Sequence, residues 1–190
     1  MGIDFLSNVN ILLINLLNVI RLNYVFSEDF FNMHIRPATT NDTDKIIDVV
    51  QSAYKLSYRG FVPDEYLNSL SINDELRKKW NGYVQKYECY VAEKDEIINA
   101  FLMLDCDDET KVFEICILYV APKFQKNGIG SQMVSHACNI KKKRGYSKCK
   151  LWTIKNGPAI NFYEKTGFIA SGQEKSWKFD IPIIEMIKAL

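Results

Sequence analysis

Residues 112 to 130 read VFEICILYVAPKFQKNGIG and carry the clearest structural signal in the chain. Its first nine residues, Val112 to Val120, are rich in β-branched and aromatic side chains and predict a strand. A turn with two glycines, Gly128 and Gly130, follows and opens an amphipathic segment. Glycine permits a tight turn and a close approach of the backbone to a ligand. Because a helix that begins there directs its unpaired N–H groups and positive dipole end at the turn, the stretch predicts a site for the pyrophosphate of a nucleotide-like cofactor.

Two other glycine-rich phosphate sites do not fit this stretch. A P-loop requires Lys and then Ser or Thr after its last glycine, whereas Gly130 is followed by Ser131 and Gln132. A dinucleotide-binding fingerprint needs a third glycine and an acidic residue about twenty positions later. Here the third glycine is missing, and residues 141–145 read KKKRG, which is basic. Both classes of site are therefore disfavoured.

A better match combines two motifs. Gln125-x-x-Gly128-x-Gly130, directly after LYVAPKF, resembles the acetyl-CoA signature of the GNAT superfamily of N-acetyltransferases. NGPAINFYEKTGF, from Asn156 to Phe168, resembles the second motif of that superfamily, and the order and spacing of the two motifs also match. The resemblance covers about Met33 to Leu190. It implies an α/β (α+β) fold with a strongly twisted mixed sheet of six to seven strands and helices on both faces.

Composition narrows the class of protein. A chain of 190 residues is most simply one domain with a substantial core. The formal net charge of +1 favours neither nucleic acid nor an anionic membrane as a partner. The five cysteines form no Cys-x-x-Cys pair and lie mostly in apolar runs, which favours free buried thiols in a reducing cytoplasm over a zinc site or a disulfide framework. No metal is expected.

The first 32 residues precede the resemblance. Val9 to Ile20 reads VNILLINLLNVI, an apolar stretch too short to span a membrane comfortably. It lacks the basic start and the cleavage site of a signal peptide. Two interpretations stay open: an amphipathic helix that packs on the domain or on a partner, or upstream sequence that folding does not need. We expect residues 1–32 to be an accessory extension and residues 33–190 to form the acetyltransferase domain. The resemblance also allows a homodimer to which the extension contributes.

Hydrophobic periodicity and turn residues predict the other elements. Strands are expected at residues 34–36, 87–93, 97–104, 112–120, 148–154, 169–179 and 181–187. Helices are expected after Pro63, from about Asn73, over residues 128–144 and from Pro158 to Gly167, with Pro158 in the first helical position. The run of cations at 141–144 complements the dipole at a helix end.

The first helix has the clearest pattern. Asn41 and Asp44 have the spacing of a capping box. The helical spacing of apolar residues then predicts a buried stripe, made of Ile46, Ile47, Val49, Val50 and Ala53.

The resemblance implies a set of acetyl-CoA contacts. Backbone N–H groups of the glycine turn would hold the diphosphate, and the residues of this loop are Gln125, Lys126, Asn127, Gly128, Ile129, Gly130 and Ser131. The strand before the loop would diverge from its parallel neighbour and pair through its backbone with the pantetheine arm at Leu118, Tyr119 and Val120. The Tyr119 or Val120 N–H would stabilise the oxyanion of the thioester. Asn156 matches a coenzyme-contacting Asn of the superfamily; its alternative role is in the turn before the next helix.

Two residues are candidates for proton transfer. Tyr163 matches the position where the superfamily often has a Tyr that protonates the leaving thiolate; the alternative is an aromatic residue packed beside Phe162 and Phe168. Glu114 is the candidate base, directly or through water. We expect an unpaired carboxylate in this apolar strand, with its pKa raised toward neutrality. Exposure to water at the strand end is the alternative.

The acceptor of the acetyl group is less defined. YRGFVPDEYL, beginning at Tyr58, occupies the region that borders the acceptor site in this fold, so Tyr58, Arg59 and Tyr66 are candidate acceptor contacts. A purely structural role in packing the helices is the alternative. Small amines, polyamines, antibiotics, amino acids and protein N-termini all remain open as acceptors.

The resemblance implies acetyl-CoA-dependent N-acetylation of a primary amine by direct transfer in a ternary complex. One enzymatic alternative is transfer through a cysteine, Cys116 or Cys149, although neither has a visible His or Lys partner. An alternative of another class is a non-catalytic domain that binds acyl-CoA as a sensor or partner module.

Overall fold

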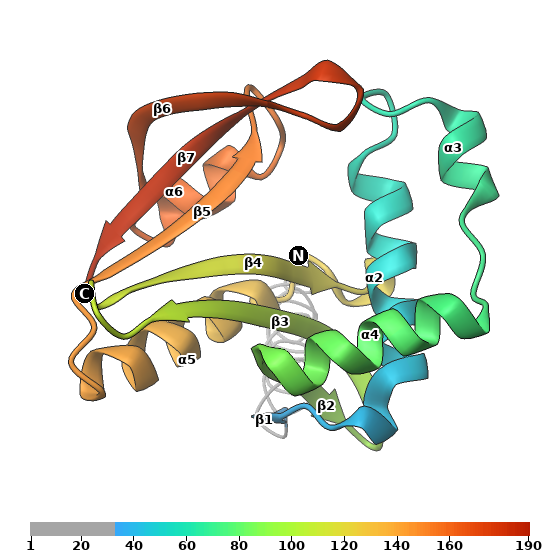
Figure 1. The fold of residues 1–190 in the computed structure, drawn as a ribbon, viewed down its shortest axis with the longest axis horizontal. Helices are drawn as coiled ribbons and strands as arrows, with labels where there is room; N and C mark the ends of the chain where they lie inside the picture. Colours follow the sequence, from blue (N-terminus) through green and yellow to red (C-terminus); the bar gives the residue numbers. More distant parts are fainter. Residues whose placement is uncertain (1–32) are drawn as a thin grey trace, which may run out of the picture. The chain divides into compact units, whose positions relative to one another are not determined.

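A computed structural model describes residues 33–190 of the chain (Figure 1). Its strands are β1 (His34–Pro37), β2 (Glu88–Lys94), β3 (Ile97–Asp107), β4 (Val112–Val120), β5 (Lys148–Ile154), β6 (Ile169–Trp177) and β7 (Ile181–Ala189). Its helices are α2 (Thr43–Ser57), α3 (Asp64–Ser69), α4 (Asp74–Lys86), α5 (Ile129–Lys143) and α6 (Ile160–Lys165). Short 3-10 turns are η1 (Thr40–Asp42), η2 (Pro122–Phe124) and η3 (Lys178–Asp180). The interpretation of residues 1–32 as an accessory extension lies outside the described residues.

The strands form one mixed sheet of seven, in the order β1-β2-β3-β4-β5-β7-β6. β4 and β5 pair in parallel, while every other neighbouring pair is antiparallel. A parallel pair needs a crossover connection, and α5 provides it. The prediction of a mixed sheet of six to seven strands is confirmed.

Helices cover both faces of the sheet (Figure 1). Phe101 and Met103 of β3 join the core cluster formed with α2 and α4. Their neighbours Leu102 and Leu104 are also buried, and because side chains alternate along a strand they face the opposite side, which α5 covers with the fully buried Met133. The two apolar faces of one sheet therefore organise two cores.

The helix α2 has the predicted buried stripe but not the predicted start. Ile46, Ile47, Val49, Val50 and Ala53 are all buried, as their spacing indicated. The capping box at Asn41 and Asp44 is wrong, because the contact lies two residues earlier: the Thr39 N–H donates to Asp42 Oδ2 at 2.8 Å.

An ion pair explains that shift. Both Asp42 carboxylate oxygens accept hydrogen bonds from the Arg36 guanidinium at 2.8 Å, and Arg36 also donates to Glu93 at 2.7 Å. These contacts hold the pKa of Asp42 at about 2. A fixed carboxylate at Asp42, and not one at Asp44, therefore satisfies the backbone before α2.

An ion pair between the buried Lys141 and the half-buried Glu88 links the end of α5 to the sheet. Lys141 is only 1% exposed and donates to Glu88 Oε2 at 2.5 Å. Arg144 and the Tyr90 hydroxyl donate to the same carboxylate, at 3.0 and 2.6 Å. The run of cations thus does more than complement the helix dipole, because Lys141 has a specific partner on β2.

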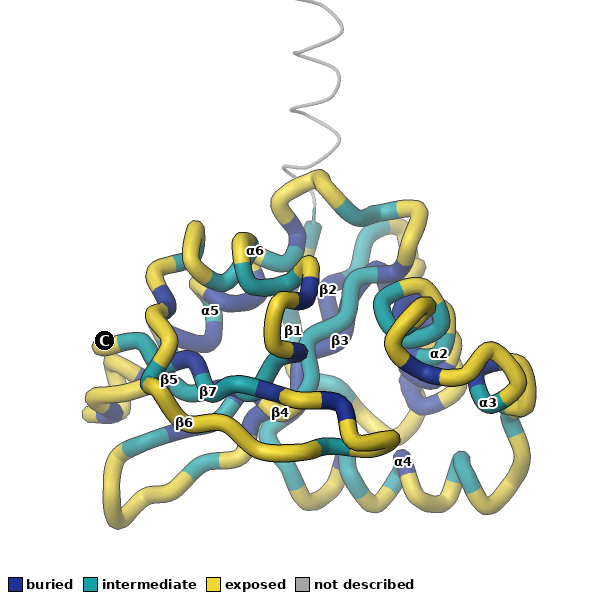
Figure 2. Tube along the Cα trace, turned by 90° about the horizontal axis from the view of Figure 1, so that it is seen from above, coloured by how far each residue is buried: buried dark blue, intermediate teal, exposed yellow. Residues whose placement is uncertain are grey.

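Burial is uneven over the sheet (Figure 2). Buried residues concentrate in β2 and β3, whereas β6 is exposed along most of its length. β4 changes character along its course: Phe113 and Ile115 are buried, and every residue from Cys116 to Val120 is exposed or half-buried. No helix within residues 33–190 is long and apolar enough to cross a membrane.

Candidate active site

The site begins where β4 leaves β5. Val112 to Ile115 pair in register with Lys148 to Leu151, and no pairing continues beyond Ile115. β5 continues to pair with β7, so the two parallel strands diverge, as Figure 1 shows. Within the described part of the chain, one edge of β4 from Cys116 to Val120 has no strand partner. The predicted divergence of these two strands is present.

The register determines which amides point into the gap. Ala121 N–H donates to the Asn99 carbonyl of the β3 side at 2.9 Å, and hydrogen-bonded and non-hydrogen-bonded pairs alternate along an antiparallel ladder. Tyr119, two residues before Ala121, therefore uses its backbone groups on β3. Leu118 and Val120 direct theirs away from β3, and Gln125 Nε2 donates to the Val120 carbonyl at 3.0 Å. Of the two oxyanion donors predicted, the Tyr119 N–H is directed into the sheet and the Val120 N–H is available.

The glycine corner is built as the sequence indicated. Lys126 and Gly128 have φ angles of 63° and 78°, so the chain turns through left-handed conformations before α5. Gln132 N–H donates to the Gly128 carbonyl at 3.0 Å, the first bond of the helix. The amides of residues 128–131 therefore have no partner inside the helix and are directed at the corner. An anion would be favoured there by these donors and by the helix dipole.

Gly130 is required for a different reason. A Cβ placed on it would lie 3.1 Å from Cζ of Phe162 and 3.3 Å from Cε2, tighter than ordinary packing. The start of α5 thus lies against the ring of Phe162 on α6. This contact couples the glycine corner to the helix that carries Tyr163. The sequence identified the glycine, but nothing in it indicated the partner ring.

Tyr163 lies in α6, which begins two residues later than predicted. Asn156 has a φ of 61° and Gly157 N–H donates to the Ile154 carbonyl at 2.9 Å, so a turn occupies residues 155–159 and Pro158 is not the first helical residue. The half-buried Tyr163 ring packs against Phe162 and Phe168, with centroids 5.0 and 5.7 Å away. Burial, followed by the nearby Tyr58, raises its pKa, so the hydroxyl stays protonated at neutral pH.

Two of the predicted acceptor residues, Tyr58 and Tyr66, make aromatic contacts, but with different parts of the chain. Tyr58 stacks on Tyr54 with ring centroids 4.2 Å apart, and the Tyr54 ring meets the Tyr119 ring edge-on with centroids 6.5 Å apart. Burial raises the pKa of both Tyr58 and Tyr119. Tyr66 contacts the η3 turn instead, through Lys178 and a ring contact to Phe179 at 5.1 Å.

The third predicted acceptor residue is more peripheral. The Arg59 side chain is exposed, and its backbone forms an isolated bridge with Val62. The structure thus brings Tyr58 close to Tyr119 and Tyr163, whereas Arg59 stays at the surface. Tyr54 was missed from the sequence, although its position four residues before Tyr58 places both rings on one face of a helix.

Glu114 is paired, contrary to the expectation of an unpaired carboxylate. Its Oε2 lies 3.3 Å from Lys150 Nζ, across the parallel β4–β5 pair. Both residues line a pocket of about 460 Å³ together with Asp105 and Asp107. Glu114 therefore lies at the closed end of the two strands, and the glycine corner lies at the other end of β4. Residues 33–190 contain no group of three His, Cys, Asp or Glu side chains placed to hold a metal ion.

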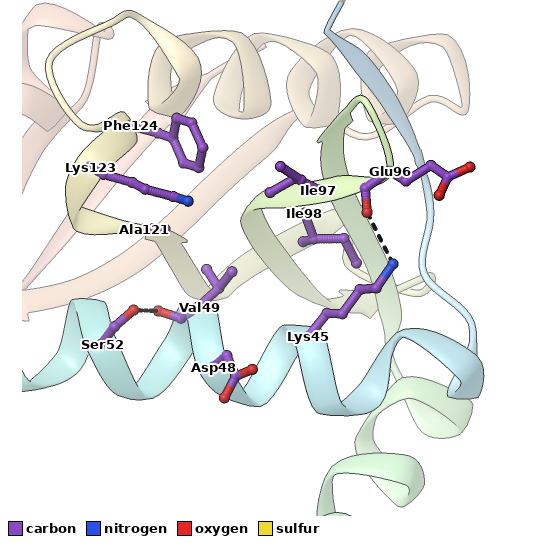
Figure 3. A pocket seen from close by; sticks show the side chains of 10 residues that line it. All are labelled: Lys45, Asp48, Val49, Ser52, Glu96, Ile97, Ile98, Ala121, Lys123 and Phe124. Atoms are coloured by element: carbon purple, nitrogen blue, oxygen red, sulfur yellow. Dashed lines mark hydrogen bonds between the residues drawn. The ribbon is translucent and has the colours of Figure 1, made fainter.

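A second pocket lies beside the loop but contains none of the predicted site residues. It measures about 520 Å³ and is formed by α2, the β2–β3 turn and η2. Figure 3 shows Lys123 and Phe124 extending from η2 toward Ile97 and Ile98, with Val49 of α2 on the opposite wall. The candidate site is thus the β4–β5 gap, the glycine corner and the tyrosines beside them, and not this pocket.

Residues 85–170 match the family described as acetyltransferase (GNAT) domain. An uncharacterized N-acetyltransferase of Archaeoglobus fulgidus is 30% identical over 137 residues, 69% of this chain and 89% of that protein. Another, from Methanocaldococcus jannaschii, is 30% identical over 156 residues, 75% of this chain but only 63% of that longer protein. A spermidine N(1)-acetyltransferase of Thermoplasma acidophilum is 26% identical over 148 residues, 72% of this chain and 88% of that protein.

The same fold occurs in solved structures. The PaiA N-acetyltransferase of Thermoplasma acidophilum in complex with coenzyme A superposes with a TM-score of 0.69 at 22% identity, covering 83% of this chain and 99% of that one. With the two motifs, the sheet order and these relatives, the chain belongs to the GNAT acetyltransferase family.

Proposed function

We propose that the protein transfers an acetyl group from acetyl-CoA to the nitrogen of a primary amine, directly and within a ternary complex. The observation that carries the proposal is the unpaired edge of β4 at Leu118 and Val120, between the glycine corner of α5 and the hydroxyl of Tyr163. Relatives named N-acetyltransferases, one of them acting on spermidine, support an amine acceptor.

The chain offers two kinds of backbone contact for the coenzyme. The free amides of residues 128–131 fit a diphosphate, and the Leu118 and Val120 groups fit the amides of a pantetheine arm. Acetyl-CoA supplies an acetyl group already activated as a thioester. The chain must therefore bind the coenzyme, orient the thioester and the amine, and provide groups for proton transfer. Candidate groups for each of these tasks are present.

Two groups act on the charge that develops during transfer. The Val120 N–H would donate to the carbonyl oxygen as it becomes negative. The C–N bond forms as the C–S bond breaks, and the Tyr163 hydroxyl would give its proton to the departing sulfur. Burial keeps that hydroxyl in the protonated form. The proton lost by the amine goes to water or, through water, to the Glu114 carboxylate, which lies 3.3 Å from Lys150 Nζ.

Direct transfer is favoured over transfer through a cysteine because the two candidate thiols are protonated at neutral pH. Desolvation, with a contribution from Glu114, raises the pKa of Cys116 to about 12. Burial also raises the pKa of Cys149. Since the thiolate is the nucleophile, neither cysteine is activated for attack on a thioester.

The test is release of free thiol from acetyl-CoA with a panel of amines, followed by mass spectrometry of the products. The proposal expects amine-dependent release, a product heavier by one acetyl group, and no acetylated enzyme after incubation without amine. A binding module would be stabilised against heat by acetyl-CoA yet release no thiol with any amine. That result would overturn the proposal.

A further inference from the structure

Trp152 of β5 lies where β5 separates from β4, on the face of the sheet opposite α5. It is the first residue of β5 beyond the last pair with β4, Leu151 with Ile115. Leu151 is buried on the α5 side, so Trp152 faces the opposite side, where it packs in the same cluster as Tyr54 and Tyr58. The half-buried indole therefore forms part of the wall of the β4–β5 gap.

The face of this indole already accepts a cation. Lys175 Nζ of β6 lies 3.8 Å from the Trp152 ring centroid, well within the range of a cation–π contact. Lys175 is exposed and forms no ion pair with any side chain of residues 33–190. An exposed ammonium held only by an aromatic face can be replaced by another ammonium.

A carboxylate lies directly beside the indole. Glu185 of β7 is the register partner of Trp152, so the two side chains project from the same face about 5 Å apart at their Cβ atoms. Glu185 is half-buried, and no hydrogen bond or ion pair reaches it from the part of the chain that the structure describes. Partial burial of an unpaired carboxylate is costly, and a bound ammonium would satisfy it.

The wider surroundings favour positive charge. The pocket next to Trp152 along β4 and β5 is lined by Asp105, Asp107 and Glu114, with Lys150 as its one cation. Together, this pocket and the surroundings of Trp152 contain four carboxylates, Glu185 included, and two ammonium groups, Lys150 and Lys175. The local charge is therefore complementary to a cationic ligand.

We propose that Trp152 and Glu185 bind a second ammonium group of the acceptor, so that the substrate class is a diamine or longer polyamine. Lys175 occupies the indole until the acceptor replaces it. β4 runs four residues from Cys116, level with Trp152, to Val120, roughly 13 Å at about 3.3 Å per residue. The two nitrogens of the acceptor are therefore separated by no more than this length. This inference rests on the proposed amine acetylation.

The experiment compares diaminobutane, diaminohexane and diaminooctane with butylamine, hexylamine and octylamine as acceptors. Each pair shares its reacting end and differs in the distal ammonium. The wild type is expected to show a kcat/KM about tenfold higher for each diamine than for the matched monoamine, because the KM of the diamine is lower. Glu185→Gln and Trp152→Leu are expected to abolish this preference, so that each diamine and its matched monoamine are used with the same kcat/KM. Lys175→Met is expected to lower the diamine KM.

Controls separate this inference from the proposed function. Glu75→Gln removes an exposed carboxylate from α4 and is expected to keep the diamine preference; thermal unfolding verifies that each variant is folded. Thiol release with equal kcat/KM for diamines and monoamines would overturn the inference and leave the proposed function intact. If no amine were turned over, the proposed function would fail. The inference would then be tested by calorimetric titration of the wild type and of Glu185→Gln with diaminohexane. Binding to the wild type that is weaker in the variant would support the inference, and absence of binding to the wild type would contradict it.

Discussion

Gly128 and Gly145 form a matched pair at the two ends of α5. Their φ angles are +78° and +83°, and a Cβ added to either would meet no atom within 4 Å. Replacing either by Ala therefore introduces left-handed strain without a clash, about 1 kcal/mol in each case. For a chain of this size, that loss lowers Tm by about 2–4 °C. The two variants should thus be equally destabilised.

Only Gly128→Ala should affect the coenzyme, because only that glycine directs the amides of residues 128–131. Loss of one hydrogen bond to a charged group costs about 1.5–3 kcal/mol, which raises Kd roughly ten- to a hundredfold. We expect calorimetric titration with coenzyme A to show this increase for Gly128→Ala and an unchanged Kd for Gly145→Ala. Equal Kd values for the two variants, with equal losses in Tm, would refute the assignment of the corner to the diphosphate.

Three further predictions follow from the site and its support. Tyr163→Phe keeps the ring contacts, so we expect unchanged Tm and a kcat lower by about 10²–10⁴; full kcat would remove Tyr163 as the acid. Gly130→Ala places a Cβ against the ring of Phe162 and should lower the free energy of unfolding by about 1–3 kcal/mol and also lower kcat. A second substitution, Phe162→Leu, should restore both quantities. If neither recovers, the ring is not the obstacle. Arg36→Met removes the partner that holds the pKa of Asp42 at about 2. A depressed pKa stabilises the fold above the unfolded value, so the wild type should be more stable by about 2 kcal/mol at neutral pH. That advantage should disappear as the pH falls from about 4 to 2 in urea unfolding experiments, and a difference that persists at pH 2 would contradict the linkage.

Local patterns in the sequence determined the elements and the corner. The apolar spacing from Ile46 to Ala53 and the strand run from Val112 to Val120 need no knowledge of the rest of the chain, and both predictions are confirmed. Gly128 was identified for its backbone freedom, and its φ of +78° agrees. These features depend on neighbouring residues alone.

Features that depend on register could not be predicted in the same way. The availability of the Val120 N–H rather than that of Tyr119 follows from the pairing of β4 with β3 and from Ala121 N–H. A shift in register occurs within this pair, between Met103 and Leu104. A shift of one residue would exchange the roles of the two amides.

Partners distant in sequence were missed for a related reason. Lys141 and Glu88 are 53 residues apart, and Lys150 reaches Glu114 only because β4 and β5 are parallel. Nothing in the run KKKR distinguishes the buried lysine from its exposed neighbours. Such contacts require the assembled sheet.

We infer that the amides at the start of α5 hold a diphosphate beside the unpaired edge of β4. The decisive experiment is titration of the folded wild-type protein with coenzyme A and, in parallel, with pantetheine, which lacks the diphosphate. We expect saturable heat with coenzyme A and binding that is at least tenfold weaker with pantetheine. Absence of heat with coenzyme A at millimolar concentration, or equal affinity for the two compounds, would contradict it.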